Sequence, residues 1–134
     1  MSSVGSIAAS GMAAASLRLQ VSANNVANAM SSGPLPGVAE AGRFPAAYRV
    51  QIVDQVDIRG GGTRASVRNA SPGTVSAYSP GAPYANSQGM VASPDVDLAT
   101  EIVQQMMARV SFAANAQMVK TSAQMTKGFL DILV

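Results

Sequence analysis

Apolar side chains recur every three or four residues along the final part of the chain, from residue 97 to residue 134. This spacing keeps them on one face of an α-helix. The run contains no proline, its only glycine is Gly128, and Asp95 or Asp97 can cap its first turn. The pattern therefore predicts one long helix. Its apolar stripe consists of Val103, Met107, Val110, Ala114, Met118, Thr121, Met125, Phe129 and Ile132.

A second helix is predicted over residues 6–29, where small and medium side chains recur with the same period. Gly5 and Gly11 each weaken this helix by roughly 1 kcal/mol relative to alanine. Both stripes are thin, because alanine and methionine stand where a self-sufficient coiled coil would use leucine and isoleucine. We therefore expect each helix to be marginal alone and the two to pack as a coiled-coil-like pair. For the run at 97–134 alone, an ordinary core helix of a small domain is the simpler interpretation.

Three asparagines, Asn24, Asn25 and Asn28, lie near the end of the first predicted helix. Asparagine is a poor helix-interior residue because its amide competes for backbone hydrogen bonds. One interpretation is a helix end, with Asn28 in the left-handed conformation before the break. The other is that these amides form hydrogen bonds with adjacent subunits. The two interpretations are compatible.

Shorter alternating patterns fill the middle of the chain. Residues 47–58 predict a strand with a bulge or break near Val53 and Asp54. Residues 63–69 and 74–78 predict two further short strands. Together these patterns predict a small antiparallel β element of two to four strands, inserted between the two terminal helices of a mainly α protein.

Turn-rich segments border these strands. Residues 31–42 form a connector after the first helix, and a linker rich in proline and glycine, which Tyr78 and Tyr84 can anchor, leads to the last helix. A solvated strand face is the simpler interpretation of the basic residues in this region, and contact with a neighbouring subunit or an acidic partner is the alternative. These basic residues are Arg43, Arg49, Arg59, Arg64 and Arg68.

Composition narrows the range of functions. Charged residues make up 12% of the chain and the net charge is +2, which is too weak a field to recruit nucleic acid. The absence of cysteine and histidine excludes disulfides, thiol nucleophiles, Ser-His-Asp triads and the usual structural zinc sites. No apolar run reaches the ~18 residues typical of a membrane span. We find no catalytic, metal or cofactor site, because helix capping explains Asp95 and Asp97 and packing explains the helical methionines.

The segment Ser22-Ala-Asn-Asn-Val-Ala-Asn-Ala resembles a motif near the amino terminus of bacterial flagellar rod and hook axial proteins. It departs from their usual Thr-Pro-Gly-Tyr-like sequel at residues 31–37. A Tyr-x-Pro-Gly-x-Pro block beginning at Tyr78, and the total length, are similar to the short proximal rod members. The resemblance implies a helical axial core domain from residues 1–30 and 97–134. The β-containing middle region and its Pro/Gly-rich connector, residues 31–96, would face outward.

This resemblance implies a structural subunit of the periplasmic flagellar rod, not an enzyme, that transmits torque from the motor to the hook. The implied partners are copies of itself, other flagellar rod proteins, and the export apparatus, membrane ring or rod adaptor protein at its base. Residues 1–17 contain no lysine or arginine, so export without a cleaved signal peptide is expected. Two alternatives are another short rod subunit of the same family, and a secreted protein that binds a membrane surface through its amphipathic carboxy-terminal helix.

Assembly contacts are expected along both terminal helices. The predicted contact residues are Ile7, Ala14, Leu17, Val21, Asn24, Asn25, Asn28, Val103, Met107, Val110, Ala114, Met118, Met125, Phe129 and Ile132.

Overall fold

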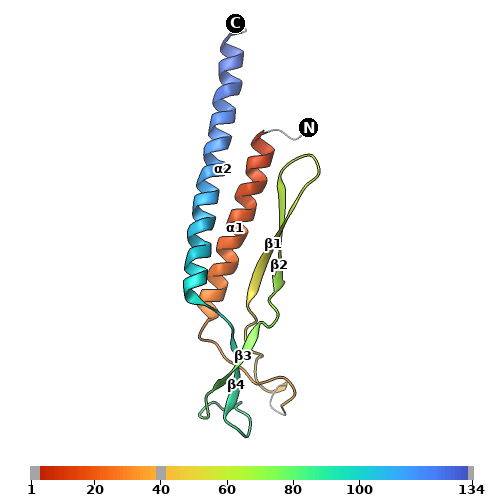
Figure 1. Ribbon diagram of the computed structural model, residues 1–134, viewed down its shortest axis with the longest axis vertical. Helices are drawn as coiled ribbons and strands as arrows, with labels where there is room; N and C mark the ends of the chain where they lie inside the picture. The colour runs from red at the N-terminus through yellow and green to blue at the C-terminus, as the bar shows by residue number, and fades with distance from the viewer. Residues whose placement is uncertain (1–3, 39–41, 133–134) are drawn as a thin grey trace.

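The computed structural model describes residues 4–38 and 42–132 and contains two long helices that pack side by side (Figure 1). Helix α1 (Val4–Asn28) and helix α2 (Leu98–Ile132) run antiparallel. Four strands lie between them in the sequence and form two separate two-stranded sheets. The fold is therefore the predicted one, a mainly α protein with a small antiparallel β element between its terminal helices.

The contact between the two helices is built from small side chains. Ala8, Ala15 and Ser22 recur every seven residues on α1 and are buried. Ala108, the buried alanine of α2, is 1% exposed. A seven-residue repeat keeps a seam between two helices in register, so the pair is coiled-coil-like with a seam of alanine and polar residues. On α2 the matching repeat is Glu101, Ala108, Asn115 and Ser122.

Gly11 allows the helices to approach closely within this seam. A Cβ atom at Gly11 would lie 2.6 Å from the Oδ1 atom of Asn115. The Asn115 amide in turn donates a hydrogen bond to the carbonyl oxygen of Ser111, at 2.8 Å. The absence of a side chain at Gly11 therefore leaves the space that the Asn115 side chain fills.

The two helices differ in length. α1 has 25 residues and α2 has 35, which at 1.5 Å per residue gives lengths of about 37 Å and 52 Å. At its carboxy-terminal end α2 extends past the start of α1 (Figure 1). Residues 123–131 are all exposed, and we call this part of α2 the overhang.

Asp97 caps the first turn of α2, as the sequence predicts. Its carboxylate accepts hydrogen bonds from the Ala99 backbone amide at 3.0 Å and from the Thr100 hydroxyl at 2.6 Å. The bond from the Thr100 hydroxyl, followed by that from the Ala99 amide, lowers the pKa of the Asp97 carboxyl.

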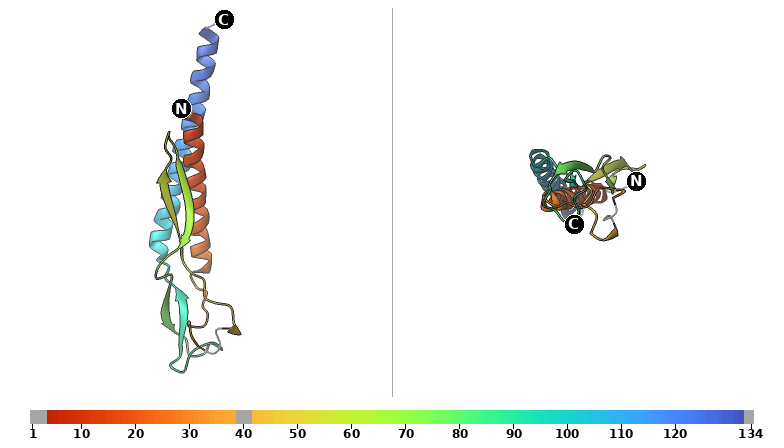
Figure 2. Two further views of the ribbon diagram at one scale, coloured as in Figure 1. Left: turned by 90° about the vertical axis from the view of Figure 1, so that its right-hand side faces the viewer. Right: turned by 90° about the horizontal axis from the view of Figure 1, so that it is seen from below.

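The first sheet is a hairpin of β1 (Gln51–Asp57) and β2 (Thr63–Asn69) that lies along α1, on another side from α2 (Figures 1 and 2). The two strands pair residue for residue, with Val53 opposite Val67 and Asp54 opposite Ser66. The predicted bulge or break near Val53 and Asp54 is therefore wrong. The irregular hydrophobic alternation accompanies a change in burial along β1, because its first three residues are half-buried and its last four are exposed.

The hairpin is held to α1 at its turn and at its middle. The Thr63 backbone amide donates a hydrogen bond to the Ser10 hydroxyl at 3.1 Å, and the Arg18 guanidinium donates one to the Gln55 side-chain oxygen at 2.5 Å. Gly62 has a φ of 92°, and a Cβ atom there would lie 2.7 Å from the Ser10 hydroxyl oxygen. Glycine is therefore required at this point of the turn.

The second sheet pairs β3 (Thr74–Tyr78) with β4 (Met90–Pro94), below the helices in Figure 1. The sequence pattern assigned Met90–Pro94 to the linker and missed this strand. Val91, at its centre, is 1% exposed, and the neighbouring Ala92 forms a bridge with Gly33. The strand thereby ties the end of α1 to the start of α2.

The anchoring of the linker is only partly as predicted. The Tyr84 hydroxyl lies 2.9 Å from the Ser32 hydroxyl, and the Tyr84 ring packs against Phe44 with 5.5 Å between centroids. Tyr78, in contrast, is exposed. The left-handed conformation predicted for Asn28 is wrong, because no described residue other than glycine has a positive φ. The Asn28 carbonyl instead accepts a hydrogen bond from the Ser31 amide at 2.9 Å, which closes a turn after the helix.

Candidate functional site

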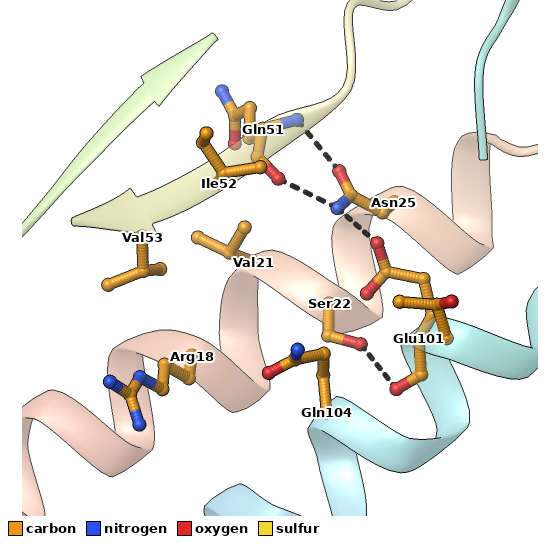
Figure 3. A pocket seen from close by; sticks show the side chains of 10 residues that line it. Arg18, Val21, Ser22, Asn25, Gln51, Ile52, Val53, Glu101 and Gln104 are labelled. Atoms are coloured by element: carbon orange, nitrogen blue, oxygen red, sulfur yellow. Dashed lines mark hydrogen bonds between the residues drawn. The ribbon is translucent and has the colours of Figure 1, made fainter. Parts of the chain in front are cut away.

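Asn25 joins the three parts of the molecule that meet near the carboxy-terminal end of α1 (Figure 3). It is 2% exposed. Its amide nitrogen donates hydrogen bonds to the Gln51 carbonyl at 2.8 Å and to the Glu101 carboxylate at 2.7 Å. Its amide oxygen accepts from the Gln51 backbone amide at 3.0 Å and from the Tyr48 hydroxyl at 2.9 Å. One side chain therefore links α1, the start of β1 and the first turn of α2.

All the ordinary hydrogen-bonding positions of the Asn25 amide are used in this joint, two as donor and two as acceptor. Ser22, one turn earlier, donates to the Glu101 backbone carbonyl at 3.1 Å. Burial, and next the negative charge of Glu101, raise the pKa of the Tyr48 hydroxyl, because both disfavour the phenolate. The hydroxyl therefore keeps its proton and remains a donor. We call Ser22, Asn25, Tyr48, Gln51 and Glu101 the joint.

A cleft of about 190 Å³ opens beside the joint, between α1, β1 and α2 (Figure 3). Its lining is mixed: Arg18 and Gln104 contribute polar groups, and Val21 and Ile52 contribute apolar ones. The described residues contain no group of three acidic side chains that could hold a metal ion. No described helix has the length and the apolar character needed to cross a membrane.

The other two asparagines lie differently. Asn24 is exposed, and its backbone carbonyl accepts a hydrogen bond from the Asn28 side chain at 2.9 Å. Asn28 is half-buried. Of the three, only Asn25 has its amide enclosed within the subunit, so Asn24 and Asn28 are the asparagines whose side chains remain accessible to a neighbour.

The apolar stripe of α2 does not face α1. Positions 101, 108 and 115 turn toward α1. At 100° per residue, the middle of the stripe lies roughly 115° around the helix from these positions, beside the contact with α1. Val110, at the middle of the stripe, is 69% exposed. The side chain of Ile132 lies outside the described residues. We call the exposed remainder the apolar face, and it consists of Val103, Met107, Val110, Ala114, Met118, Met125 and Phe129.

The predicted contact residues of α1 are divided between the interior and the surface. Ala14 and Val21 are buried on the side that meets the hairpin, where Ala14 lines a groove together with Ile58 and Ala65. Leu17 is half-buried and Ile7 is 39% exposed. The structure thus brings Ala14, Leu17 and Val21 together with the hairpin. It leaves the predicted α2 residues from Val103 to Phe129 exposed.

Sequence reasoning missed the partners of Asn25. Tyr48 and Gln51 lie at the beginning of a strand, and neither has a distinctive neighbour in the sequence. Glu101 lies in the first turn of α2, where the helix dipole alone favours an acidic residue, so its presence there does not indicate a hydrogen-bonding role. The seven-residue recurrence of Ala8, Ala15 and Ser22 was the available signal for the helix–helix seam, but a search for large apolar residues does not detect it.

Comparison with known proteins connects these features to a family. Residues 87–130 match the profile described as "Flagellar basal body rod FlgEFG protein C-terminal". The chain is 30% identical to the "Flagellar basal-body rod protein FlgC" of Agrobacterium fabrum over 139 residues, which cover 99% of this chain and 95% of the relative. It is 38% identical to the protein of that name from Salmonella typhimurium, covering 89% and 87%. The FlgC of Buchnera aphidicola is 31% identical, with 94% and 93% covered.

Proposed function

The chain belongs to the family of flagellar basal-body rod proteins, and from this premise we propose that it is a structural subunit of the proximal rod that polymerises through its terminal helices. The three relatives described above carry the same name, which supports this subunit over another short member of the family. The role is mechanical: the subunit transmits torque from the motor toward the hook and performs no catalysis.

The observation that carries this proposal is the exposed apolar face of α2. The helix pair is already formed within one subunit, yet the apolar face takes no part in it. Burial of apolar surface contributes about 25 cal/mol per Å². A face that covers several turns of a helix therefore gains most of its stabilisation only when other molecules cover it. An extended row of exposed apolar residues of this kind marks an interaction surface.

The two parts of the chain have separate tasks in this proposal. Residues 1–30 and 97–134 form the helical axial core domain, and their contact residues pack against copies of the chain and other rod proteins. Residues 31–96 form the middle region, which faces outward. At the base of the rod the partners are the export apparatus, the membrane ring or the rod adaptor protein. The assembled subunit lies in the periplasm and reaches it without a cleaved signal peptide.

A charge on the apolar face tests this proposal. Val110→Asp or Met118→Asp places a carboxylate where assembly would strip its water away, which costs several kcal/mol per contact. We expect such subunits to be exported normally but to be absent from purified basal bodies, and the cells to be non-motile. The measurement is immunoblotting of the basal-body and unassembled fractions in cells whose own copy has been replaced.

The matched control is Lys120→Glu. Lys120 is exposed on the same helix but outside the apolar face, so a negative charge there remains in water. We expect this variant to enter basal bodies at the normal level. Normal rods from cells that carry Val110→Asp would overturn the proposal.

A further inference from the structure

Four of the eight methionines of the chain lie on α2 and are exposed. Met106, Met107, Met118 and Met125 have exposed fractions between 49 and 60%. Three of them belong to the apolar face. Met106 lies beside the face and lines a shallow groove with Met107 and Val110. The surface that is apolar is therefore also the surface that carries most of the accessible thioethers of this helix pair.

Thioethers are the principal targets of two-electron oxidants in this chain, because it contains no cysteine and no tryptophan. Hypochlorous acid reacts with a methionine by oxygen transfer. The sulfur is oxidised to a sulfoxide, the chlorine is reduced to chloride, and one proton is released to water. The product is a polar side chain in place of an apolar one, and methionine sulfoxide reductases restore the thioether.

We propose that the apolar face of α2, together with the adjacent Met106, is an oxidation-sensitive surface. Conversion of Met106, Met107, Met118 and Met125 to sulfoxides prevents docking until the thioethers are restored. This inference rests on the proposed function, in which neighbouring subunits cover the same face. It adds a chemical modification that acts on the unassembled subunit and that assembly itself prevents.

The physical basis is the desolvation of the sulfoxide oxygen. In the free subunit this oxygen is a strong hydrogen-bond acceptor that faces water. Docking against an apolar neighbour removes the water and supplies no donor, which is unfavourable for any buried acceptor. We expect each buried sulfoxide to weaken docking about tenfold, since an unsatisfied buried polar group commonly costs that much in an equilibrium constant.

The reactivity of the methionines in the isolated full chain is the first test. Met12 and Met90 are half-buried, whereas Met30 is 93% exposed and lies outside the apolar face. After limiting hypochlorous acid, peptide mass spectrometry should show sulfoxide forming at the four α2 methionines and at Met30 several-fold faster than at Met12 and Met90. Equal rates at all these sites would overturn the inference.

The effect on docking is the second test. Glutamine is similar in length to methionine sulfoxide and also presents an oxygen acceptor, so Met107→Gln with Met118→Gln mimics two oxidised sites. We expect at least a tenfold loss of this variant from basal bodies, with an unchanged circular dichroism spectrum. Met30→Gln is the matched control and should be incorporated normally. Normal incorporation of the double variant would overturn the inference.

Leucine variants separate oxidation at these sites from other damage. Cells that carry leucine at all four α2 positions, and cells that carry the native chain, are exposed to hypochlorous acid during rod growth. Each is compared with its own untreated culture, so that any change in starting affinity cancels. For the native chain, the amount of subunit in basal bodies should be lower in treated than in untreated cells. For the leucine variant, the two amounts should be the same. A parallel fall in both would overturn the inference.

These outcomes are distinguishable from failure of the proposed function. If Val110→Asp enters basal bodies normally, the apolar face is not the assembly surface and both proposals fail. If Val110→Asp is excluded but the double glutamine variant is incorporated normally, only the oxidation inference fails.

Discussion

At the scale of single residues, Asn25 is the side chain on which the arrangement of the molecule depends most. Its hydrogen bonds reach both α2 and the start of β1. These segments are far apart in the sequence and have no other shared side chain of this kind among the described residues. An amide is suited to this position because it offers donors and acceptors together on one small group.

Truncation of Asn25 measures the contribution of the joint. We expect Asn25→Ala to lower the free energy of unfolding by about 2–4 kcal/mol, because it leaves the Glu101 carboxylate and the Gln51 backbone groups without their partner in a buried place. Urea denaturation of the isolated chain, followed by circular dichroism, is the measurement. Asn24→Ala, at the exposed neighbour, should change the value by less than about 0.5 kcal/mol. Equal losses for the two variants would contradict this role of Asn25.

The sequence indicated an asparagine motif at a helix end or in contact with adjacent subunits, but it did not indicate the bonds that Asn25 forms within the subunit. Asn24 and Asn25 are successive residues on a helix, so their side chains point about 100° apart. Which of them is buried depends on where α2 and the hairpin pack, and that is decided by residues far away in the chain. Helix periodicity could therefore identify the group of asparagines, but it could not identify the buried one.

At the scale of elements, the close approach of α1 and α2 depends on Gly11 and Asn115. We expect Gly11→Ala to be destabilising, because its Cβ atom displaces the Asn115 side chain from the hydrogen bond with Ser111. In an Asn115→Ala background the same change should instead stabilise the protein by about 0.5–1 kcal/mol, the gain in helix propensity. A double-mutant cycle of unfolding free energies measures the difference.

The sign change is the critical result of that cycle. If Gly11→Ala has the same effect whether or not Asn115 is present, the two residues are not coupled, and the helices do not meet at this point in solution.

The elements themselves were predictable to different degrees. Both helices have clear apolar periods and clear ends, and Asp97 marks the start of α2, so their bounds agree with the sequence to within a few residues. β4 was missed because its five residues follow a segment rich in proline and glycine and end in Pro94. It becomes a strand through pairing with β3, which is a tertiary effect that local pattern does not contain.

At the scale of the whole molecule, α2 is supported unevenly. Residues 101–122 include the half-buried and buried positions of the seam with α1, whereas the overhang at residues 123–131 is exposed throughout. We expect backbone amides in the overhang to exchange hydrogen rapidly in the dilute isolated chain, and amides near Ala108 to exchange at least tenfold more slowly, because packing raises the cost of local opening. Hydrogen exchange followed by mass spectrometry measures both segments in one sample. Uniformly slow exchange along all of α2 would contradict the expectation.

The arrangement of the whole molecule was predictable in outline only. The sequence indicated two terminal helices with a β element between them, and the structure has this order. The sequence could not indicate that small residues, Ala15 and Ala108 among them, would form the contact between the two helices. Nor could it indicate that the large apolar residues of α2 would remain exposed. Hydrophobic patterns identify surfaces that avoid water, but they do not specify whether the same chain or another one covers them.

The unequal lengths of α1 and α2 make the two ends of the subunit chemically unlike. One end is a single bare helix and the other is a folded β tip. Subunits that stack head to tail inherit this polarity, so a growing filament has a leading tip and a trailing tip with different chemistry. Growth of the filament is then directional, because an incoming subunit meets a different surface at each end.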